Sequence, residues 1–287
     1  MAERALVVIP TYNEAINLPQ IVPLVLSQDP RLEVLNFGVG GYGTDQAFLR
    51  YQRDGIQFQP EIVLLGIMPE NIYRLVNRFR PFYLAQSGIP LTKPRYVLRS
   101  GKLVLLENPM RSIGEYRQLL SNPAEILPRL GDGDYYFENK YRSGALDFLG
   151  SIRLAKVVWY EFQENAQGSI VRHGAYHEAG DAFQILCSIA DEFAQFATRH
   201  GSKPVILILP ERIDLSREIR GSDRRYAPLL SHLRARGYSW LDLSPSLVQA
   251  AKAQGLSDVI DGHYTPFGNE VVAKSIHDYL ADQGWLN

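Results

Sequence analysis

The chain has 287 residues, with 30 basic and 31 acidic side chains and a formal net charge of −1. This balance argues against a nucleic-acid partner, because binding to a phosphate backbone requires a basic face. Hydrophobic residues make up 46% and charged residues 21%, as in soluble globular proteins, so the composition argues against disorder.

The single cysteine, Cys187, excludes an intramolecular disulfide and a cysteine-based zinc site. No apolar stretch approaches the roughly 20 residues that span a bilayer. The apolar run at 5–9 is too short for a secretory signal and is followed by Pro10. The sequence therefore predicts a cytoplasmic protein with no membrane span.

Short apolar runs rich in β-branched residues alternate along the chain with helical patterns. The candidate strands are 5–9, 32–37, 62–67, 204–209 and 238–243. The candidate helices are 18–27, 45–53, 144–164, 180–200, 222–236 and 266–283. Continuous apolar strands separated by helices predict a mostly parallel five-stranded sheet covered on both faces, a three-layer α/β/α sandwich of the doubly wound, flavodoxin-like type.

The stretch 77–143 breaks this alternation and is rich in Pro, Gly, Arg and Tyr. Within it, 95–98 and 102–106 are joined through Ser100 and Gly101 and predict a β-hairpin. Long insertions in compact domains tend to be lids or binding loops. We expect one α/β domain over 1–287, with an inserted lid at 77–143.

Ligands of open parallel sheets bind beyond the carboxyl ends of the strands, so the loops after the candidate strands are examined first. Residues 36–46 (NFGVGGYGTDQ) have four glycines in six residues. Such a loop can point N–H groups at a ligand, or it can be a tight turn without one. After the third strand, Asn71 can place its amide over a substrate or cap a helix.

After the fifth strand, Asp261 and His263 lie two residues apart with a glycine between them. A carboxylate held against one ring nitrogen fixes the imidazole tautomer and stabilises the imidazolium formed during general-base catalysis. A solvated loop histidine is the alternative interpretation.

Together these segments resemble the SGNH, or GDSL-type, hydrolase superfamily, from about residue 33 to the C-terminus. The resemblance implies an SGNH-type fold and makes Gly41 the oxyanion-hole glycine, with Asp261 and His263 as acid and base. An ungapped match puts Glu70 at the position of the oxyanion-hole asparagine, and a shift of one residue puts Asn71 there. We expect Asn71, because a carboxylate would repel a developing oxyanion.

Residues 1–34 lack the Gly-Asp-Ser block of that superfamily. Residues 5 to about 34, which begin with ALVVIPTYNEA, resemble instead the start of family 2 glycosyltransferases of the polyprenol-phosphate mannosyltransferase type, in which a strand that ends in Pro-Thr-Tyr-Asn-Glu contacts the nucleotide. The carboxylate motifs that follow in that family are absent further along this chain, which argues against a glycosyltransferase activity.

If the first strands of the two families align, Thr11 falls near the position of the missing serine. A threonine hydroxyl can act as a nucleophile beside a base. Its extra methyl group restricts χ1, and threonine at a strand–helix junction more commonly caps the helix. Both roles of Thr11 stay open.

Several other histidines, arginines and aromatic residues could bind a ligand, but each could instead have a purely structural role. His173 and His177 are spaced to bind a metal on a helix, but nearby glycines and the lack of a third ligand favour an exposed or structural role. No metal or other cofactor is predicted. The arginines at 74, 78, 80 and 95 can bind an anionic sugar or form a solvated face. Residues 135–137 (YYF) can line a carbohydrate groove or pack a lid.

The sequence thus predicts an esterase or O-acyltransferase of SGNH type whose partner is a small-molecule or glycan ester, with Thr11 or no residue in place of the serine. A non-catalytic SGNH-fold binding protein is the main alternative. A nucleotide-sugar-binding protein that uses residues 1–34 is the second.

Overall fold

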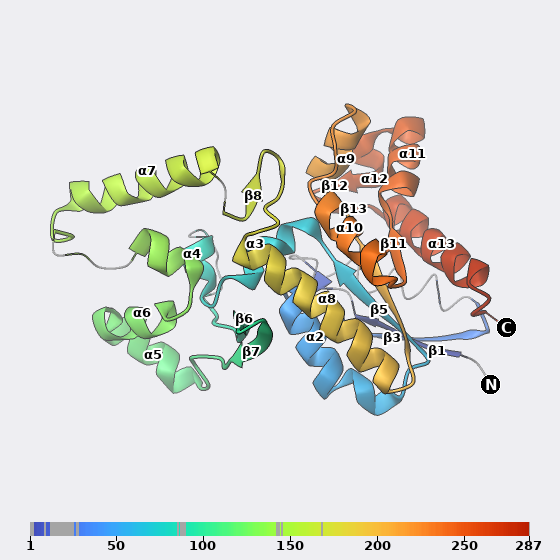
Figure 1. Ribbon diagram of the computed structural model, residues 1–287, viewed down its shortest axis with the longest axis horizontal. Coiled ribbons are helices and arrows are strands. Elements are labelled where there is room, and N and C mark those ends of the chain that lie inside the picture. The colour runs from blue at the N-terminus through green and yellow to red at the C-terminus, as the bar shows by residue number, and fades with distance from the viewer. Residues whose placement is uncertain are drawn as a thin grey trace. The chain divides into compact units, whose positions relative to one another are not determined.

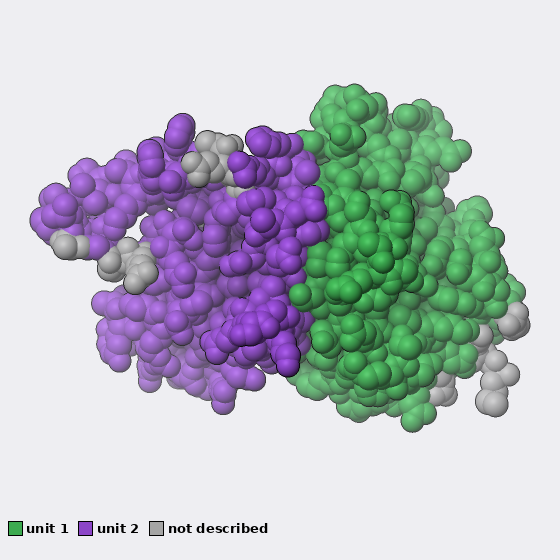
Figure 2. Space-filling view, viewed as in Figure 1, with its two compact units in different colours: residues 1–71, 186–287 green, residues 72–185 purple. Residues whose placement is uncertain are grey.

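A computed structural model of the chain describes residues 3–8, 10–11, 26, 29–84, 86, 90–141, 144, 146–167 and 169–286. For residues 3–8, 10–11 and 165–167 it describes the backbone alone. The chain divides into two compact units (Figure 2): unit 1 comprises Met1–Asn71 and Leu186–Asn287, and unit 2 comprises Ile72–Ile185.

Unit 1 is built on a five-stranded sheet in the order β11-β10-β5-β1-β3 (Figure 1). The strands are β1 (Glu3–Val8), β3 (Leu32–Asn36), β5 (Ile62–Ile67), β10 (Lys203–Ile208) and β11 (Trp240–Asp242). All four neighbouring pairs are parallel, and Leu64 of β5 lies opposite Val7 on one side and Val205 on the other. The predicted parallel sheet is confirmed.

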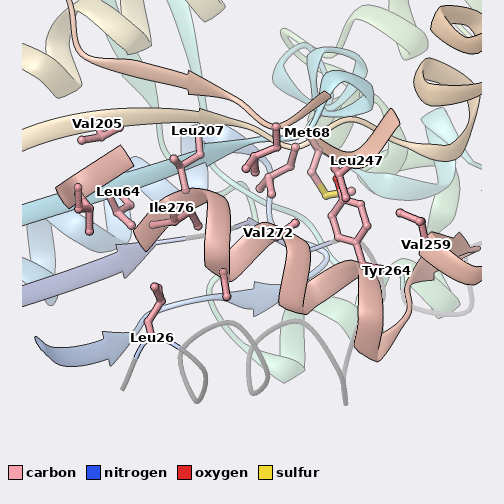
Figure 3. Packing of buried hydrophobic residues seen from close by; sticks show 14 of the residues in the cluster. Leu26, Leu64, Met68, Val205, Leu207, Leu247, Val259, Tyr264, Val272 and Ile276 are labelled. Atoms are coloured by element: carbon pink, nitrogen blue, oxygen red, sulfur yellow. The ribbon is translucent and has the colours of Figure 1, made fainter. Parts of the chain in front are cut away.

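Helices cover both faces of this sheet, because successive side chains of a strand point to opposite sides. On one face, Leu64 and Leu207 belong to a buried apolar cluster with Leu247 of α11 (Ser244–Gln254) and Ile276 of α13 (Pro266–Asp282) (Figure 3). On the other face lie α2 (Thr44–Arg53) and α8 (Asp181–Arg199) (Figure 1). Their rings pack edge to face, with the centroids of Tyr51 and Phe196 5.6 Å apart. The three-layer α/β/α sandwich is therefore confirmed.

Shorter elements complete unit 1. Two-residue strands pair as β2 (Pro10–Thr11) with β4 (Val39–Gly40), in parallel, and as β12 (Ile260–Asp261) with β13 (His263–Tyr264), antiparallel. The described part of unit 1 also contains the 3-10 turns Gly55–Phe58 and Pro69–Asn71, and α9 (Arg212–Ile219), α10 (Ala227–Arg236) and α12 (Leu256–Val259).

Unit 2 contains the predicted insertion and continues beyond it. Its strands form two hairpins, β6 (Arg95–Arg99) with β7 (Lys102–Leu106), and β8 (Val171–Arg172) with β9 (Ala175–Tyr176). Its helices are α3 (Ile72–Leu75), α4 (Arg80–Tyr83), α5 (Ile113–Ser121), α6 (Pro123–Gly131), the π-helix Phe137–Tyr141 and α7 (Gly150–Gln167). The expected β6–β7 hairpin is confirmed; a lid function for 77–143 stays a prediction.

The buried carboxylate of Asp134 organises the chain around it in unit 2. Its oxygens accept hydrogen bonds from the backbone N–H groups of Arg78, Phe79, Tyr136 and Phe137. Burial raises the pKa of Asp134, and these backbone hydrogen bonds oppose that rise. The carboxylate thereby holds two segments together that lie more than 50 residues apart.

Two predicted helices begin later than expected. The helix expected at 144–164 begins at Gly150, and Asp147 accepts a hydrogen bond from the backbone N–H of Gly144 in a turn before it. The helix expected at 222–236 begins at Ala227, because a proline follows in its first turn, where no N–H is needed. The helix expected at 18–27 falls outside the described residues except for Leu26.

We expect Leu64→Ala to lower the free energy of unfolding by about 2–5 kcal/mol, because the side chain is fully buried in a strand paired on both sides. The measurement is urea denaturation followed by circular dichroism. Ile213→Ala is the matched control, since Ile213 is 56% exposed and its loss should cost less than about 0.5 kcal/mol. Equal losses for the two variants would contradict the placement of the core.

Candidate functional site

The glycine-rich segment carries Gly41, one of the residues of the candidate site. Residue 40 pairs with Thr11 between β4 and β2, so the backbone of Thr11 lies beside the glycines. Gly41 has φ +85°, a conformation that favours glycine, and the N–H of Tyr42 returns to the carbonyl of Val39 at 3.2 Å. The side chain of Thr11 lies outside the described residues, so its role as nucleophile stays a prediction.

Asn71 closes the 3-10 turn that follows the central strand β5. Its side chain is fully buried, and its backbone N–H donates to the carbonyl of Met68 at 2.9 Å. Neither the amide nitrogen nor the amide oxygen of its side chain has a hydrogen-bond partner among the described residues. Buried polar groups are nearly always paired, so this amide requires an explanation, and a ligand that completes it is one.

His263 and Asp261 lie directly opposite each other across the β12–β13 pair. Gly262 between them has φ +73°, which permits so tight a reversal. His263 is partly buried, whereas Asp261 is exposed. The two residues predicted as base and acid are thus cross-strand partners on one turn.

Hydrogen bonds fix this turn to the end of the sheet. The hydroxyl of Tyr264 donates to the carbonyl of Pro210, and Arg212 donates to the carbonyl of Ile260, both at 2.5 Å. The N–H of Leu209 in turn donates to the carbonyl of Ile67 at 2.9 Å. The turn that carries His263 is therefore held at the same end of β10 and β5 from which Asn71 follows.

A carboxylate cluster at this edge was not predicted from the sequence. Glu211 is the N-cap residue of α9, just after β10, and its neighbours include Glu70, Asp214 and Arg225. Arg225 forms ion pairs with Glu211 and with Asp214, the latter at 2.6 Å. Burial raises the pKa of Glu211 to about 7, the cation of Arg225 opposes this rise, and Glu70 adds to it.

One signal for this cluster was present in the sequence. Glu211 follows a candidate strand just as Asn71 does, so the rule that selected the other loops applies to it as well. Arg225 is 14 residues further along the chain, in the loop between α9 and α10, and reaches Glu211 only in the folded chain.

A separate cavity of about 430 Å³ lies within unit 2. Tyr135 and Tyr160 line it together with polar side chains that include Gln163, Arg172 and His177. Tyr135 donates to Glu164 at 2.8 Å, and burial is the main cause that raises its pKa to about 12. Aromatic faces beside amide, guanidinium and carboxylate groups are suited to a ligand with both apolar faces and hydroxyl groups.

The histidines and arginines that the sequence suggested as metal or anion ligands have other roles in the structure. His173 and His177 belong to the β8–β9 segment and are not on a helix, and the described residues contain no group of three potential metal ligands. Arg78 and Arg95 are buried and donate to backbone carbonyls, Arg95 to Val76 at 2.8 Å. They therefore form no solvated face.

The described helices include none that combines the length and the apolar character needed to cross a membrane. No protein-family model and no curated protein matches the chain.

Solved structures with a similar fold include three proteins with low sequence identity to this chain. An acetylxylan esterase from Geobacillus stearothermophilus is 11% identical over 97% of this chain and 94% of that one, with a TM-score of 0.47. A protein of the G-D-S-L family from Desulfitobacterium hafniense is 11% identical over 96% and 99%, with a TM-score of 0.45. An α/β hydrolase from the metagenome of Lake Arreo, Spain, is 13% identical over 100% and 98%, with a TM-score of 0.46. These scores lie below 0.5, so the fold class rests on the sheet order and register.

We expect Glu211→Gln to become more stable relative to the natural protein as the pH rises. The folded protein holds the Glu211 proton up to a pKa of about 7, above the ordinary value of 4.5, so the natural protein loses stability between these two values. The difference in the free energy of unfolding between Glu211→Gln and the natural protein should grow by at most about 1.4 kcal/mol per pH unit. The measurement is urea denaturation between pH 5 and 8.

Glu218→Gln is the control of opposite sign. A hydrogen bond from Arg224 lowers the pKa of Glu218, so the carboxylate contributes stability that is present above its unfolded pKa and lost as the pH falls. Glu218→Gln should be less stable than the natural protein at pH 7, and the difference in the free energy of unfolding between the two should shrink as the pH falls. A pH-independent effect of Glu211→Gln would contradict the raised pKa.

Proposed function

We propose that the chain is a hydrolase of SGNH type that cleaves O-acyl esters, with a site at the carboxyl edge of the unit 1 sheet. The observation that carries the proposal is the Asn71 amide, which is fully buried at the end of the central strand and whose two polar atoms have no hydrogen-bond partner among the residues that the structure describes. An amide N–H held in this way costs no reorganisation when an oxyanion forms beside it. The Gly41 backbone N–H is the second proposed donor.

In the proposed reaction, the hydroxyl oxygen of Thr11 bonds to the acyl carbon of the ester. His263 accepts the hydroxyl proton of Thr11 in the same step. The carbonyl oxygen becomes an oxyanion, which Asn71 and Gly41 stabilise, while Asp261 stabilises the imidazolium. His263 then returns the proton to the leaving alkoxide as the ester bond breaks. Water releases the acyl group from Thr11 by the same steps, and the free carboxylic acid is the second product.

A carbohydrate is the proposed carrier of the acyl group. Support comes from the unit 2 cavity, whose aromatic rings Tyr135 and Tyr160 lie beside hydrogen-bonding side chains. Sugar rings combine apolar C–H faces with hydroxyl groups, and such a lining offers partners for both.

The cavity also favours a second candidate, a non-catalytic glycan-binding protein. This function requires the unit 2 lining but no nucleophile, in keeping with the lack of a Gly-Asp-Ser block in residues 1–34. The glycosyltransferase-like residues 1–34 stay a sequence resemblance, since few of their side chains are described.

We expect the purified chain to hydrolyse p-nitrophenyl acetate, and His263→Ala to lower kcat/KM by about 10²–10⁴-fold through loss of the general base. Thr11→Val should abolish turnover, whereas Thr11→Ser should retain or raise it. His173→Ala is the matched control, because this histidine is exposed on the unit 2 hairpin. An active chain that is unaffected by His263→Ala would refute the site. Glycan binding without turnover, even by Thr11→Ser, would favour the second candidate.

Asn71→Ala should lower kcat by about 10²–10³-fold through loss of an oxyanion donor. It should cost little stability, because the buried amide that it removes makes no hydrogen bond to any described residue. The matched control is Asn77→Ala. Asn77 is also buried, but it donates to the carbonyl of Phe79 at 2.8 Å and to Asp134 at 2.9 Å, so its loss should destabilise by about 1–3 kcal/mol. A comparable loss of stability in both variants would assign Asn71 a structural role.

A further inference from the structure

The unit 2 cavity is lined by residues from three stretches of the chain. Tyr135 comes from the turn before the π-helix, Tyr160 comes from α7, and Arg172 lies on β8. Figure 1 shows β8 near one end of α7. The cavity volume of about 430 Å³ falls within the range of small-molecule sites, roughly 300–1,000 Å³. The lining therefore has the size of a ligand site, and its polar groups indicate which ligand fits.

The carboxylate of the lining, that of Glu164, is already used within the protein. One of its oxygens accepts hydrogen bonds from the backbone N–H groups of Ser169 at 3.1 Å and Ile170 at 3.3 Å. The other accepts from the hydroxyls of Ser169 at 2.7 Å and Tyr135 at 2.8 Å. Four donors occupy the lone-pair sites of a carboxylate, so Glu164 fixes the lining and leaves little capacity to bind a ligand.

The cation of the lining, that of Arg172, is not used in this way. Arg172 is exposed, and its guanidinium makes no hydrogen bond or ion pair with any residue that the structure describes. The ammonium group of Lys140 lies 4.5 Å from the centroid of the Tyr160 ring, but it is paired with Glu161 at 2.8 Å. The described lining thus combines a satisfied carboxylate with a guanidinium that is available to a ligand.

A guanidinium and two aromatic rings are partners for different parts of one ligand. The planar guanidinium matches the oxygens of a carboxylate or a phosphate group and binds them with two parallel hydrogen bonds. The rings of Tyr135 and Tyr160, whose centroids are 6.3 Å apart, present apolar surface to the C–H faces of a sugar. A neutral sugar would use the rings and leave the guanidinium without a partner.

We propose that the unit 2 cavity binds a sugar ring that carries an anionic group. Arg172 binds the anionic oxygens, and Tyr135 and Tyr160 contact the ring. The inference rests on the glycan ligand of the proposed function and narrows it to acidic glycans. The carboxylate of a uronic acid and the phosphate ester of a sugar share this chemistry.

The test is a ligand-detected NMR titration of the full chain at low ionic strength. D-glucuronic acid is compared with D-glucuronamide, which has the same ring and a neutral amide in place of the carboxylate. We expect the dissociation constant of the acid to be at least about tenfold lower, because hydrogen bonds to charged groups are stronger than neutral ones. Added salt should reduce this preference, since Arg172 is exposed.

Glucose 6-phosphate distinguishes the two sources of the anion. If it binds more tightly than glucuronic acid and glucuronamide, the anionic group is a phosphate ester. If glucuronic acid binds most tightly of the three, the anionic group is a uronic acid carboxylate. Either order supports the proposal.

Arg172→Gln should remove the preference, so that this variant binds the acid and the amide about equally. Arg172→Lys should retain only part of it, because an ammonium group keeps the charge but lacks the planar pair of donors. Arg117→Gln is the matched control. Arg117 on α5 is also exposed in unit 2 but lies outside the lining, so this variant has the same change in net charge and should keep the preference.

A natural chain that binds the anionic sugars no more tightly than glucuronamide would overturn the proposal. So would a preference that Arg172→Gln leaves intact. Hydrolysis of p-nitrophenyl acetate is measured separately. A chain that hydrolyses this ester without preferring an anionic sugar would lose the present inference and keep the proposed esterase activity. A chain with the preference but no hydrolysis would keep the anionic-sugar site and lose the proposed chemistry.

Discussion

The complete burial of β5 is the constraint on which unit 1 depends. All six of its residues are buried, and its neighbours β1 and β10 pair with it in parallel on either side. A strand covered on both faces and hydrogen-bonded along both edges has no room for a polar side chain. The first position at which the chain can present one lies just beyond Ile67, and the Pro69–Asn71 turn occupies that position.

The same constraint determines where the histidine turn lies. Because β10 is in register with β5 up to Ile208 opposite Ile67, the segment after β10 emerges beside Asn71. Pro210 and Arg212 in that segment bind the β12–β13 turn through Tyr264 and Ile260. The position of His263 is therefore set by strand register and by hydrogen bonds that span about 50 residues of sequence.

Continuous apolar strands and the Ser100–Gly101 turn were readable from the sequence, since both are local signals. Ser100 and Gly101 both have positive φ, as a two-residue hairpin loop requires. Helix α9 was missed because its buried residues are only Asp214 and Leu215, which leaves no apolar periodicity. The carboxylate cluster was missed for a different reason, because its cation, Arg225, comes from outside α9 and reaches Glu211 and Asp214 only in the packed fold.

Two buried polar side chains, Asp134 and Asn71, differ in the number of hydrogen bonds that they make within the protein. Asp134 accepts four backbone N–H groups and the amide of Asn77, so hydrogen bonds within the protein oppose the cost of its desolvation. Asn71 is as deeply buried, yet both of its side-chain polar atoms lack partners among the described residues. A buried amide without hydrogen bonds destabilises the fold, and this cost is recovered only when a bound ligand supplies a partner. A bound oxyanion in unit 1 would accept a hydrogen bond from the amide nitrogen of Asn71, and this is the reason for proposing the edge beyond β5, and not the more fully bonded centre of unit 2, as the place of the chemistry.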